Sequence, residues 1–150
     1  MNIRILARVI TYDSKENKIL LVKNRGTNFW YAPGGQWEHK KETILEAAKR
    51  EVKEETGLNV EIVCLLYVQE FHATEDTIFF ETFWLAKPQI YTKLSKLHMD
   101  LDPNGQVETA KWFLQTDLQE IKVFPKRLKD TFWKNIKNFL DQEDPFIGVS

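Results

Sequence analysis

Three glutamates stand where one helix would bring their side chains together. Glu51, Glu54 and Glu55 are spaced i, i+3 and i+4, and on a helical wheel Glu51 and Glu55 fall beside the apolar residues Ile44 and Ala48. Ionised carboxylates one turn apart repel each other, and partial burial strengthens the repulsion. Either the pKa values of these carboxyl groups rise or a cation neutralises them. Three carboxylates suit a hard divalent ion such as Mg²⁺ or Mn²⁺, whereas the sequence has no Cys/His cluster typical of zinc.

The alternative interpretation is a solvated acidic face of an amphipathic helix, which is the usual origin of a run of charges. It accounts well for Glu46, which lies opposite the apolar face, and poorly for Glu51 and Glu55. Arg50 is four residues from both Glu46 and Glu54, so we expect it to hold a carboxylate in place by a charge-assisted hydrogen bond.

A glycine pair lies shortly before the acidic segment. Pro33 is followed by Gly34 and Gly35. Paired glycines allow positive φ angles and a close approach of the backbone to a ligand, although a plain turn would have the same sequence. The pair gains weight only from its position a few residues before the glutamates.

The segment that carries the glutamates has clear signals for both ends of a helix. Thr43 and Glu46 match a capping box, in which each side chain bonds the backbone of the other residue. Gly57 stands where a left-handed C-terminal cap belongs. The sequence therefore predicts a helix over residues 43–56.

The remaining elements follow from apolar periodicity. Strands are expected at residues 3–12, 18–23, 29–31, 58–71, 77–86 and 107–115, and a second helix at 127–140. The first two strands should form a hairpin, as should the fourth and fifth. The segment 87–106 reads as a long irregular loop, and loops of that length usually serve a function. The order predicts an α+β fold with a mixed sheet and segregated helices.

Composition restricts the class of protein. The chain has 150 residues, 21 Lys+Arg, 22 Asp+Glu and one cysteine, which fits a single domain over residues 1–150 without disulfides. The near-zero net charge argues against a nucleic-acid-coating protein. We find no apolar run long enough to cross a bilayer and no signal-peptide pattern, so we expect no membrane partner and a cytoplasmic location, as a monomer or homodimer.

Residues 34–58, GGQWEHKKETILEAAKREVKEETGL, resemble the signature box of the Nudix hydrolases. The family pattern is Gly, five residues, Glu, seven residues, then Arg-Glu-aliphatic-x-Glu-Glu-x-Gly-aliphatic. Residues 50–58 match its second half without a gap, and seven residues separate Glu42 from Arg50. The sequence departs from the pattern once, because six residues separate Gly35 from Glu42 and Lys41 replaces the usual Gly. The extra residue leaves the helix register intact and puts the places of Glu42 and the Gly35 carbonyl in question.

The resemblance implies an α/β/α sandwich with a mixed sheet between helices. It also implies metal-dependent hydrolysis of a nucleoside diphosphate linked to another group, such as a nucleoside triphosphate or a nucleotide sugar like ADP-ribose. Carried over by position, Glu51, Glu54, Glu55 and the Gly35 carbonyl would bind Mg²⁺ or Mn²⁺. Glu51 would activate water, and Arg50 would orient the carboxylates. The substrate would be a small nucleotide, with nucleic acid not expected as a partner.

Residues outside the box supply further candidates. Glu108, just before Trp112, is our choice for an additional metal ligand or base, with Asp100 and Asp102 as rivals. Arg25 could bind a phosphate because its planar fork matches phosphate oxygens. Trp30 could stack on a base, although core packing is the preferred interpretation for it.

Two other functions are open at this point. The chain could be a catalytically idle domain that binds a nucleotide and regulates another protein, although a pure binder has no need of the glutamate set. It could also process RNA 5′ ends, since basic residues accumulate in the last predicted helix.

Overall fold

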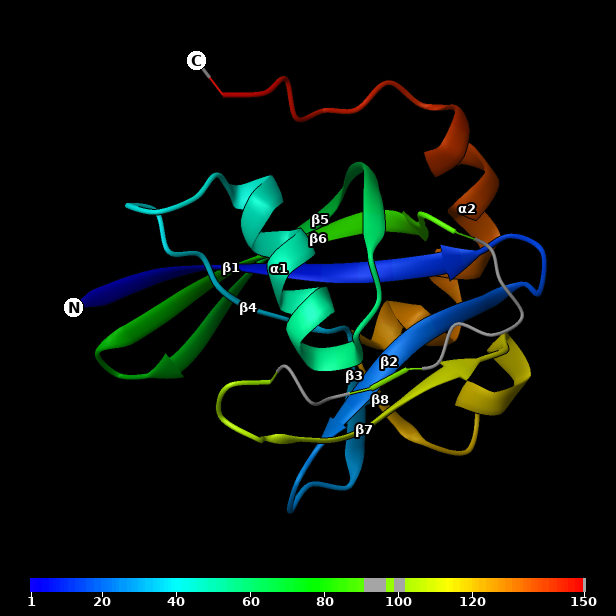
Figure 1. The fold of residues 1–150 in the computed structure, drawn as a ribbon, viewed down its shortest axis with the longest axis horizontal. Helices are drawn as coiled ribbons and strands as arrows, with labels where there is room; N and C mark the ends of the chain where they lie inside the picture. Colours follow the sequence, from blue (N-terminus) through cyan, green and yellow to red (C-terminus); the bar gives the residue numbers. More distant parts are fainter. Residues whose placement is uncertain (91–96, 99–101, 150) are drawn as a thin grey trace.

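A mixed β-sheet with a helix on each face forms the protein (Figure 1). The computed structural model describes residues 1–90, 97–98 and 102–149. Its strands are β1 (Asn2–Asp13), β2 (Lys18–Asn24), β3 (Phe29–Tyr31), β4 (Gly34–Gln36), β5 (Val60–Thr74), β6 (Thr77–Pro88), β7 (Val107–Phe113) and β8 (Lys122–Phe124). The helices are α1 (Ile44–Thr56) and α2 (Thr131–Asp141), with short 3₁₀ turns η1 (Gln115–Leu118) and η2 (Lys126–Lys129).

The sheet has the order β5-β6-β1-β2-β3-β8, with β4 paired to β1 and β7 paired to β2. The pairs β1/β6 and β3/β8 are parallel and the others are antiparallel. Both predicted hairpins are confirmed, since β1 pairs with β2 and β5 with β6. The sheet is mixed because β1 pairs in parallel with β6, which is distant in the sequence, and antiparallel with its sequence neighbour β2.

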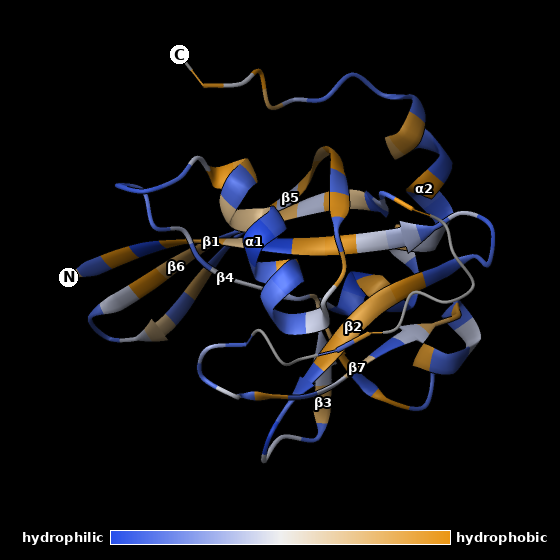
Figure 2. Ribbon diagram, viewed as in Figure 1, coloured by the Kyte–Doolittle hydropathy of each residue, from blue (hydrophilic) through white to orange (hydrophobic). Residues whose placement is uncertain are grey.

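Two apolar cores lie on opposite faces of the sheet. On one face Val52 of α1 packs with Val9 of β1 and Leu20 of β2. On the other, Phe132 of α2 packs with the alternate residues Ile10 and Leu21. Four consecutive residues of β2, from 19 to 22, are fully buried, and Figure 2 shows this strand as a continuous hydrophobic band. Strands with both faces covered read as such runs. The expected α/β/α sandwich is confirmed.

The predicted start of the second helix was wrong, and two short strands were missed. The second helix begins at Thr131 rather than at residue 127, because the side chain of Asp130 accepts the Thr131 N–H and starts a new helix after η2. β4 and β8 have three residues each, too few for a periodic signal. Within the residues that the structure describes, no helix is both long and apolar enough to cross a membrane.

The acidic helix has the ends that its sequence predicts. Thr43 accepts the Glu46 N–H at 3.2 Å, and the Glu46 carboxylate accepts the Thr43 N–H at 3.0 Å. Gly57 closes the helix with φ 78°. These caps fix both the start and the rotation of α1, so the side chains of its glutamates have defined directions.

The glycine pair forms the strand β4, which pairs antiparallel with β1. Gly34 pairs with Arg8, and Gly35 pairs with Ala7. Neither glycine has a positive φ, so that part of the expectation was wrong. Gly34 instead packs tightly on β1: a Cβ there would lie 2.2 Å from the Ala7 carbonyl oxygen and 2.6 Å from the Arg8 Cα.

We predict that Gly34→Ala destabilises the fold by about 3 kcal/mol, because the added methyl meets backbone atoms that cannot move aside. Urea unfolding measures the change. Gly26→Ala is the matched control: Gly26 has φ +77° and open space around it, so its substitution should cost only the left-handed strain of about 1 kcal/mol. Equal effects of the two substitutions would contradict the steric explanation.

Candidate active site

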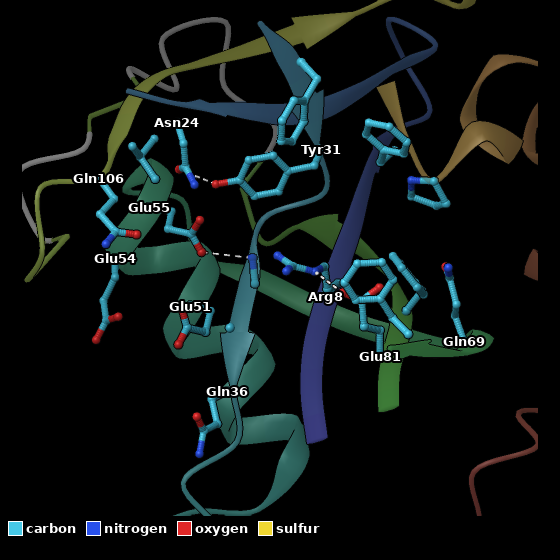
Figure 3. A pocket seen from close by; sticks show the side chains of 18 of the residues that line it. Arg8, Asn24, Tyr31, Gln36, Glu51, Glu54, Glu55, Gln69, Glu81 and Gln106 are labelled. Atoms are coloured by element: carbon cyan, nitrogen blue, oxygen red, sulfur yellow. Dashed lines mark hydrogen bonds and ion pairs between the residues drawn. The ribbon is translucent and has the colours of Figure 1, made fainter. Parts of the chain in front are cut away.

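A pocket of about 1370 Å³ opens beside α1 and β4 (Figure 3). Its lining has an acidic end, formed by glutamates of α1, and an aromatic end, formed by side chains of β3, β5 and β6 and by residues around η2. The glycine strand β4 separates the two ends. The volume is large enough for a nucleotide-sized ligand.

Glu55 is the most deeply buried carboxylate of the acidic end, with 6% of its surface exposed. It accepts the backbone N–H of Gly34 at 2.9 Å. Burial raises its pKa well above the ordinary value, and the neighbouring Glu51 raises it further. Arg8 opposes the shift because its positive charge favours the ionised form.

Glu51 lies against the glycine strand. A Cβ on Gly35 would sit 2.5 Å from the Glu51 Oε1, so only glycine leaves room for this carboxylate. Burial raises the pKa of Glu51 despite the opposing effect of Arg50. The carboxyl groups of Glu51 and Glu55 are hydrogen-bonded to each other, so the two titrate as a pair.

Arg50 lines the acidic end of the pocket and contacts three carboxylates. Its Nε lies 2.7 Å from Glu42 Oε1 and its Nη2 lies 3.1 Å from Glu42 Oε2, which makes the contact bidentate. Its Nη1 contacts Glu51 at 2.9 Å and Glu54 at 3.2 Å. The hydrogen bonds with Glu42 raise the pKa of Arg50. The extra residue before Glu42 therefore does not displace this side chain.

The expected contact of Arg50 with Glu46 was wrong. The Glu46 carboxylate is engaged in the capping box at the start of α1, so it is not available to the arginine. The contact with Glu54 is confirmed. Besides Glu51 and Glu54 of its own helix, Arg50 contacts Glu42, which precedes the helix.

The acidic end has the chemistry of a divalent cation site. Glu51 and Glu55 are like charges held together in a half-enclosed place, and the glycine at position 35 preserves the space for one of them. Glu54 contacts the same Arg50 Nη1 as Glu51 and lies beside it on α1 (Figure 3). Among the described residues no three acidic, cysteine or histidine side chains are gathered as tightly as a bound ion requires. Carboxylate oxygens are the donors that Mg²⁺ prefers, so the residues fit such an ion once Glu54 turns inward.

The aromatic end begins at Tyr31. Its hydroxyl donates to the Asn24 side-chain oxygen, and burial raises its pKa. The Arg8 guanidinium lies over the Tyr31 ring at 5.4 Å and pairs with Glu81 at 3.5 Å between Nε and Oε1. Phe29, in edge contact with Phe124 at 5.4 Å, lines the pocket beyond.

Three residues singled out in the sequence lie outside the pocket. Glu108 is 46% exposed and pairs with Lys23 at 3.6 Å. Arg25 donates to the Gly105 carbonyl at 2.9 Å and so anchors the segment before β7. Trp30 packs on the core, edge-on to Phe113 at 4.8 Å, as its preferred interpretation held.

Of the two rival acidic residues, Asp102 lines the pocket and Asp100 lies outside the described residues. The carboxylate of Asp102 accepts the N–H of Asn104 at 3.3 Å and that of Val107 at 2.9 Å. This side chain therefore shapes the turn before β7.

Sequence reasoning overlooked Arg8, Glu81 and Asn24 as pocket residues. A signal was present for the first two, because each is a charge within an otherwise apolar strand, in β1 and β6 respectively. Among the aromatic residues of β5 and β6, Phe71 and Phe83 line the pocket, while Trp84 is buried in the core beside α1.

Comparisons with known proteins agree with this geometry. The family model described as NUDIX domain matches residues 3–136. The 8-oxo-dGDP phosphatase NUDT18 of Danio rerio is 37% identical over 71 residues, which are 46% of this chain and 22% of that protein. The chain thus spans about a fifth of the length of this relative.

Solved structures of the same shape include a UDP-X diphosphatase, with TM-score 0.68, 17% identity and coverage of 94% of this chain and 64% of the other. An ADP-ribose pyrophosphatase from Streptococcus suis has TM-score 0.62 and 20% identity, with coverage of 92% and 90%. At these identities the likeness concerns the fold. The family match spans most of the chain and includes the acidic helix, so the chain belongs to the Nudix family.

Proposed function

We propose that this chain is a cytoplasmic, Mg²⁺-dependent pyrophosphohydrolase that cleaves a nucleoside diphosphate linked to another group. The observation that carries the proposal is the buried pair Glu51 and Glu55 at one end of a pocket that continues into aromatic side chains. A site built this way binds a dense anion through a cation at one end and a planar group at the other. The relatives named as phosphatases and diphosphatases of nucleotides support the same reaction class.

Glu51, Glu54 and Glu55 would hold the cation, and the Gly35 carbonyl would complete the set. When bound, Mg²⁺ neutralises pyrophosphate charge and makes a water a better nucleophile. Glu51 is the residue we assign to accept the proton of the attacking water, because burial raises its pKa toward the working pH. Manganese has the same preference for oxygen ligands and should substitute.

Arg50 positions the carboxylates. It is bonded to Glu42 through two parallel hydrogen bonds, and this anchor fixes the guanidinium beneath Glu51 and Glu54. A bidentate contact adds geometric precision as well as energy. Phosphoryl transfer depends mainly on positioning and on stabilisation of charge, so a rigid carboxylate set is what the reaction requires of the protein.

We predict that Glu54→Gln and Glu55→Gln each lower Mg²⁺-dependent turnover by at least about a hundredfold, since each removes one negative charge that would hold the cation. Turnover is measured as phosphate release from a panel of nucleoside di- and triphosphates and nucleotide sugars, with Mg²⁺ and with Mn²⁺. Glu46→Gln, on the same helix but outside the pocket, is the control and should keep wild-type activity because glutamine also completes a capping box. Full activity in both pocket variants would refute the assignment.

The same panel separates the two other functions. An idle binding domain would bind nucleotides in calorimetry and release no product in Mg²⁺. An RNA 5′-end enzyme would act on 5′-triphosphorylated RNA and lose that activity alone when Lys134 and Lys137 of α2 are changed to Glu. Neither result is expected if the substrate is a small nucleotide.

We predict that Glu55→Gln makes the metal-free protein more stable at alkaline pH. Because the pKa of Glu55 is higher in the folded than in the unfolded chain, its contribution to stability is full below the unfolded pKa and falls as pH rises through the folded value. Glutamine does not titrate and can still accept the Gly34 N–H. In the presence of a chelator, the variant should exceed the wild type in unfolding free energy at about pH 8, and the difference should shrink toward about pH 5.

Urea unfolding across this pH range provides the measurement. Glu61→Gln is the control, because Glu61 is exposed and its ion pair within the described part of the chain is with Lys87, at 3.7 Å. Its difference from the wild type should not show the same trend with pH. A wild type that is more stable than the Glu55→Gln protein at alkaline pH would contradict the role of burial.

A further inference from the structure

The Arg8–Glu81 pair lies in the pocket wall between the acidic and aromatic ends. Arg8 is on β1 and Glu81 on β6, two strands that pair in parallel. Their side chains are only 20% and 15% exposed, yet they face the pocket rather than the core. Charged groups at this depth persist when they are paired or when they meet a ligand.

The guanidinium of Arg8 is held in place, but several of its N–H donors are not used by the described residues. Its Nε lies 3.5 Å from the Glu81 carboxylate, and its plane rests on the Tyr31 ring at 5.4 Å. Among the described residues, no hydrogen bond engages its two terminal nitrogens. An arginine carries five N–H donors in a rigid fork, so several donors remain for a bound molecule.

A second side chain with unused hydrogen-bonding capacity lies in the same row of the sheet as Arg8. Phe83 of β6 stands between Arg8 of β1 and Tyr67 of β5, and paired residues of neighbouring strands project from the same face. The Tyr67 hydroxyl is buried and, within the part of the chain that the structure describes, has no hydrogen-bond partner. Gln69 occupies the same face one row away, opposite Glu81. The wall therefore presents donors and acceptors side by side.

The net charge of the pair indicates what kind of group it meets. A phosphate would face the Glu81 carboxylate together with Arg8, and the acidic end already contains three glutamates. Arg8 and Glu81 together are neutral, so they suit an uncharged group that offers both an acceptor and donors. Phe71 lines the same part of the pocket and is exposed, so its ring can stack on a planar heterocycle.

We propose that Arg8 and Glu81 are specificity-determining residues that read the hydrogen-bonding edge of the nucleobase and favour a guanine-type edge. The inference rests on the proposed function. A guanine edge offers a carbonyl oxygen to the Arg8 fork, next to a ring N–H and an amino group that both donate to the two oxygens of Glu81. Adenine offers a ring nitrogen acceptor where guanine offers that N–H, so it leaves a carboxylate oxygen facing a lone pair.

The experiment compares kcat/KM for the triphosphates of guanosine, inosine and adenosine, and for ribose 5-triphosphate, which has no base. In the wild type we expect guanosine to exceed adenosine by at least about tenfold, equivalent to about 1.4 kcal/mol, with inosine between them because it lacks the amino group. Glu81→Gln should remove most of this preference, because an amide has one acceptor oxygen and its NH₂ faces the donors of the base. Hydrolysis of ribose 5-triphosphate should decline much less in Glu81→Gln than hydrolysis of guanosine triphosphate.

Arg8→Lys is a second variant, which keeps the charge and removes the fork, and it should likewise reduce the preference for guanosine over adenosine. Glu61→Gln removes an exposed ion pair from the same β5/β6 hairpin and should leave the preference intact. Equal kcat/KM for guanosine and adenosine triphosphates in the wild type would overturn the inference. So would a Glu81→Gln protein in which all four substrates decline together.

Failure of the proposed function gives a different result. If the wild type hydrolyses neither these four compounds nor any member of the wider panel of nucleoside di- and triphosphates and nucleotide sugars, the enzyme assignment falls, and calorimetric binding of GDP and ADP then tests the pair directly. Tighter binding of GDP that Glu81→Gln abolishes would still support base reading. Equal binding of the two nucleotides would exclude it.

Discussion

The arrangement depends on keeping two like charges together out of water. Glu51 and Glu55 project from the face of α1 that packs toward the sheet, where each would repel the other when ionised. The fold accommodates them with one hydrogen bond from the Gly34 backbone, space at Gly35, and the Arg50 guanidinium on the far side. Such a cluster is costly for the apoprotein and becomes favourable when a cation enters.

The acidic end was predictable because it is a local feature. Thr43, Glu46 and Gly57 mark the helix ends within the sequence itself, and the helical period then decides which glutamates turn inward. Arg50 was located correctly, but its main partner was not, because the chain between residues 36 and 42 folds Glu42 back over the helix. Spacing along a helix predicts which side chains of that helix are neighbours. It does not predict contacts with a residue that a preceding loop brings back to the helix.

The aromatic end was largely hidden because it is assembled by strand pairing. Arg8, Glu81 and Tyr67 come from three strands, and the parallel β1/β6 register brings Arg8 beside the β5/β6 hairpin that carries the other two. The strand β7 shows the same limit of sequence reasoning. Glu108 and Val107 are sequence neighbours, yet alternation along β7 sends Val107 to the pocket and Glu108 to Lys23. Two adjacent residues of the same strand therefore lie in different surroundings.

The contact between β2 and β7 shifts its register between Lys23 and Asn24. Beyond this irregularity, Asn24 reaches the Tyr31 hydroxyl, and Arg25 fastens the strand to Gly105. One side of the pocket is thus set by the offset of β2 and β7, which, among the described residues, contribute none of the glutamates that line it. Insertions or deletions there would change the shape of this side of the pocket and leave the acidic helix in place. Related proteins could therefore come to bind different ligands without a change in the glutamates.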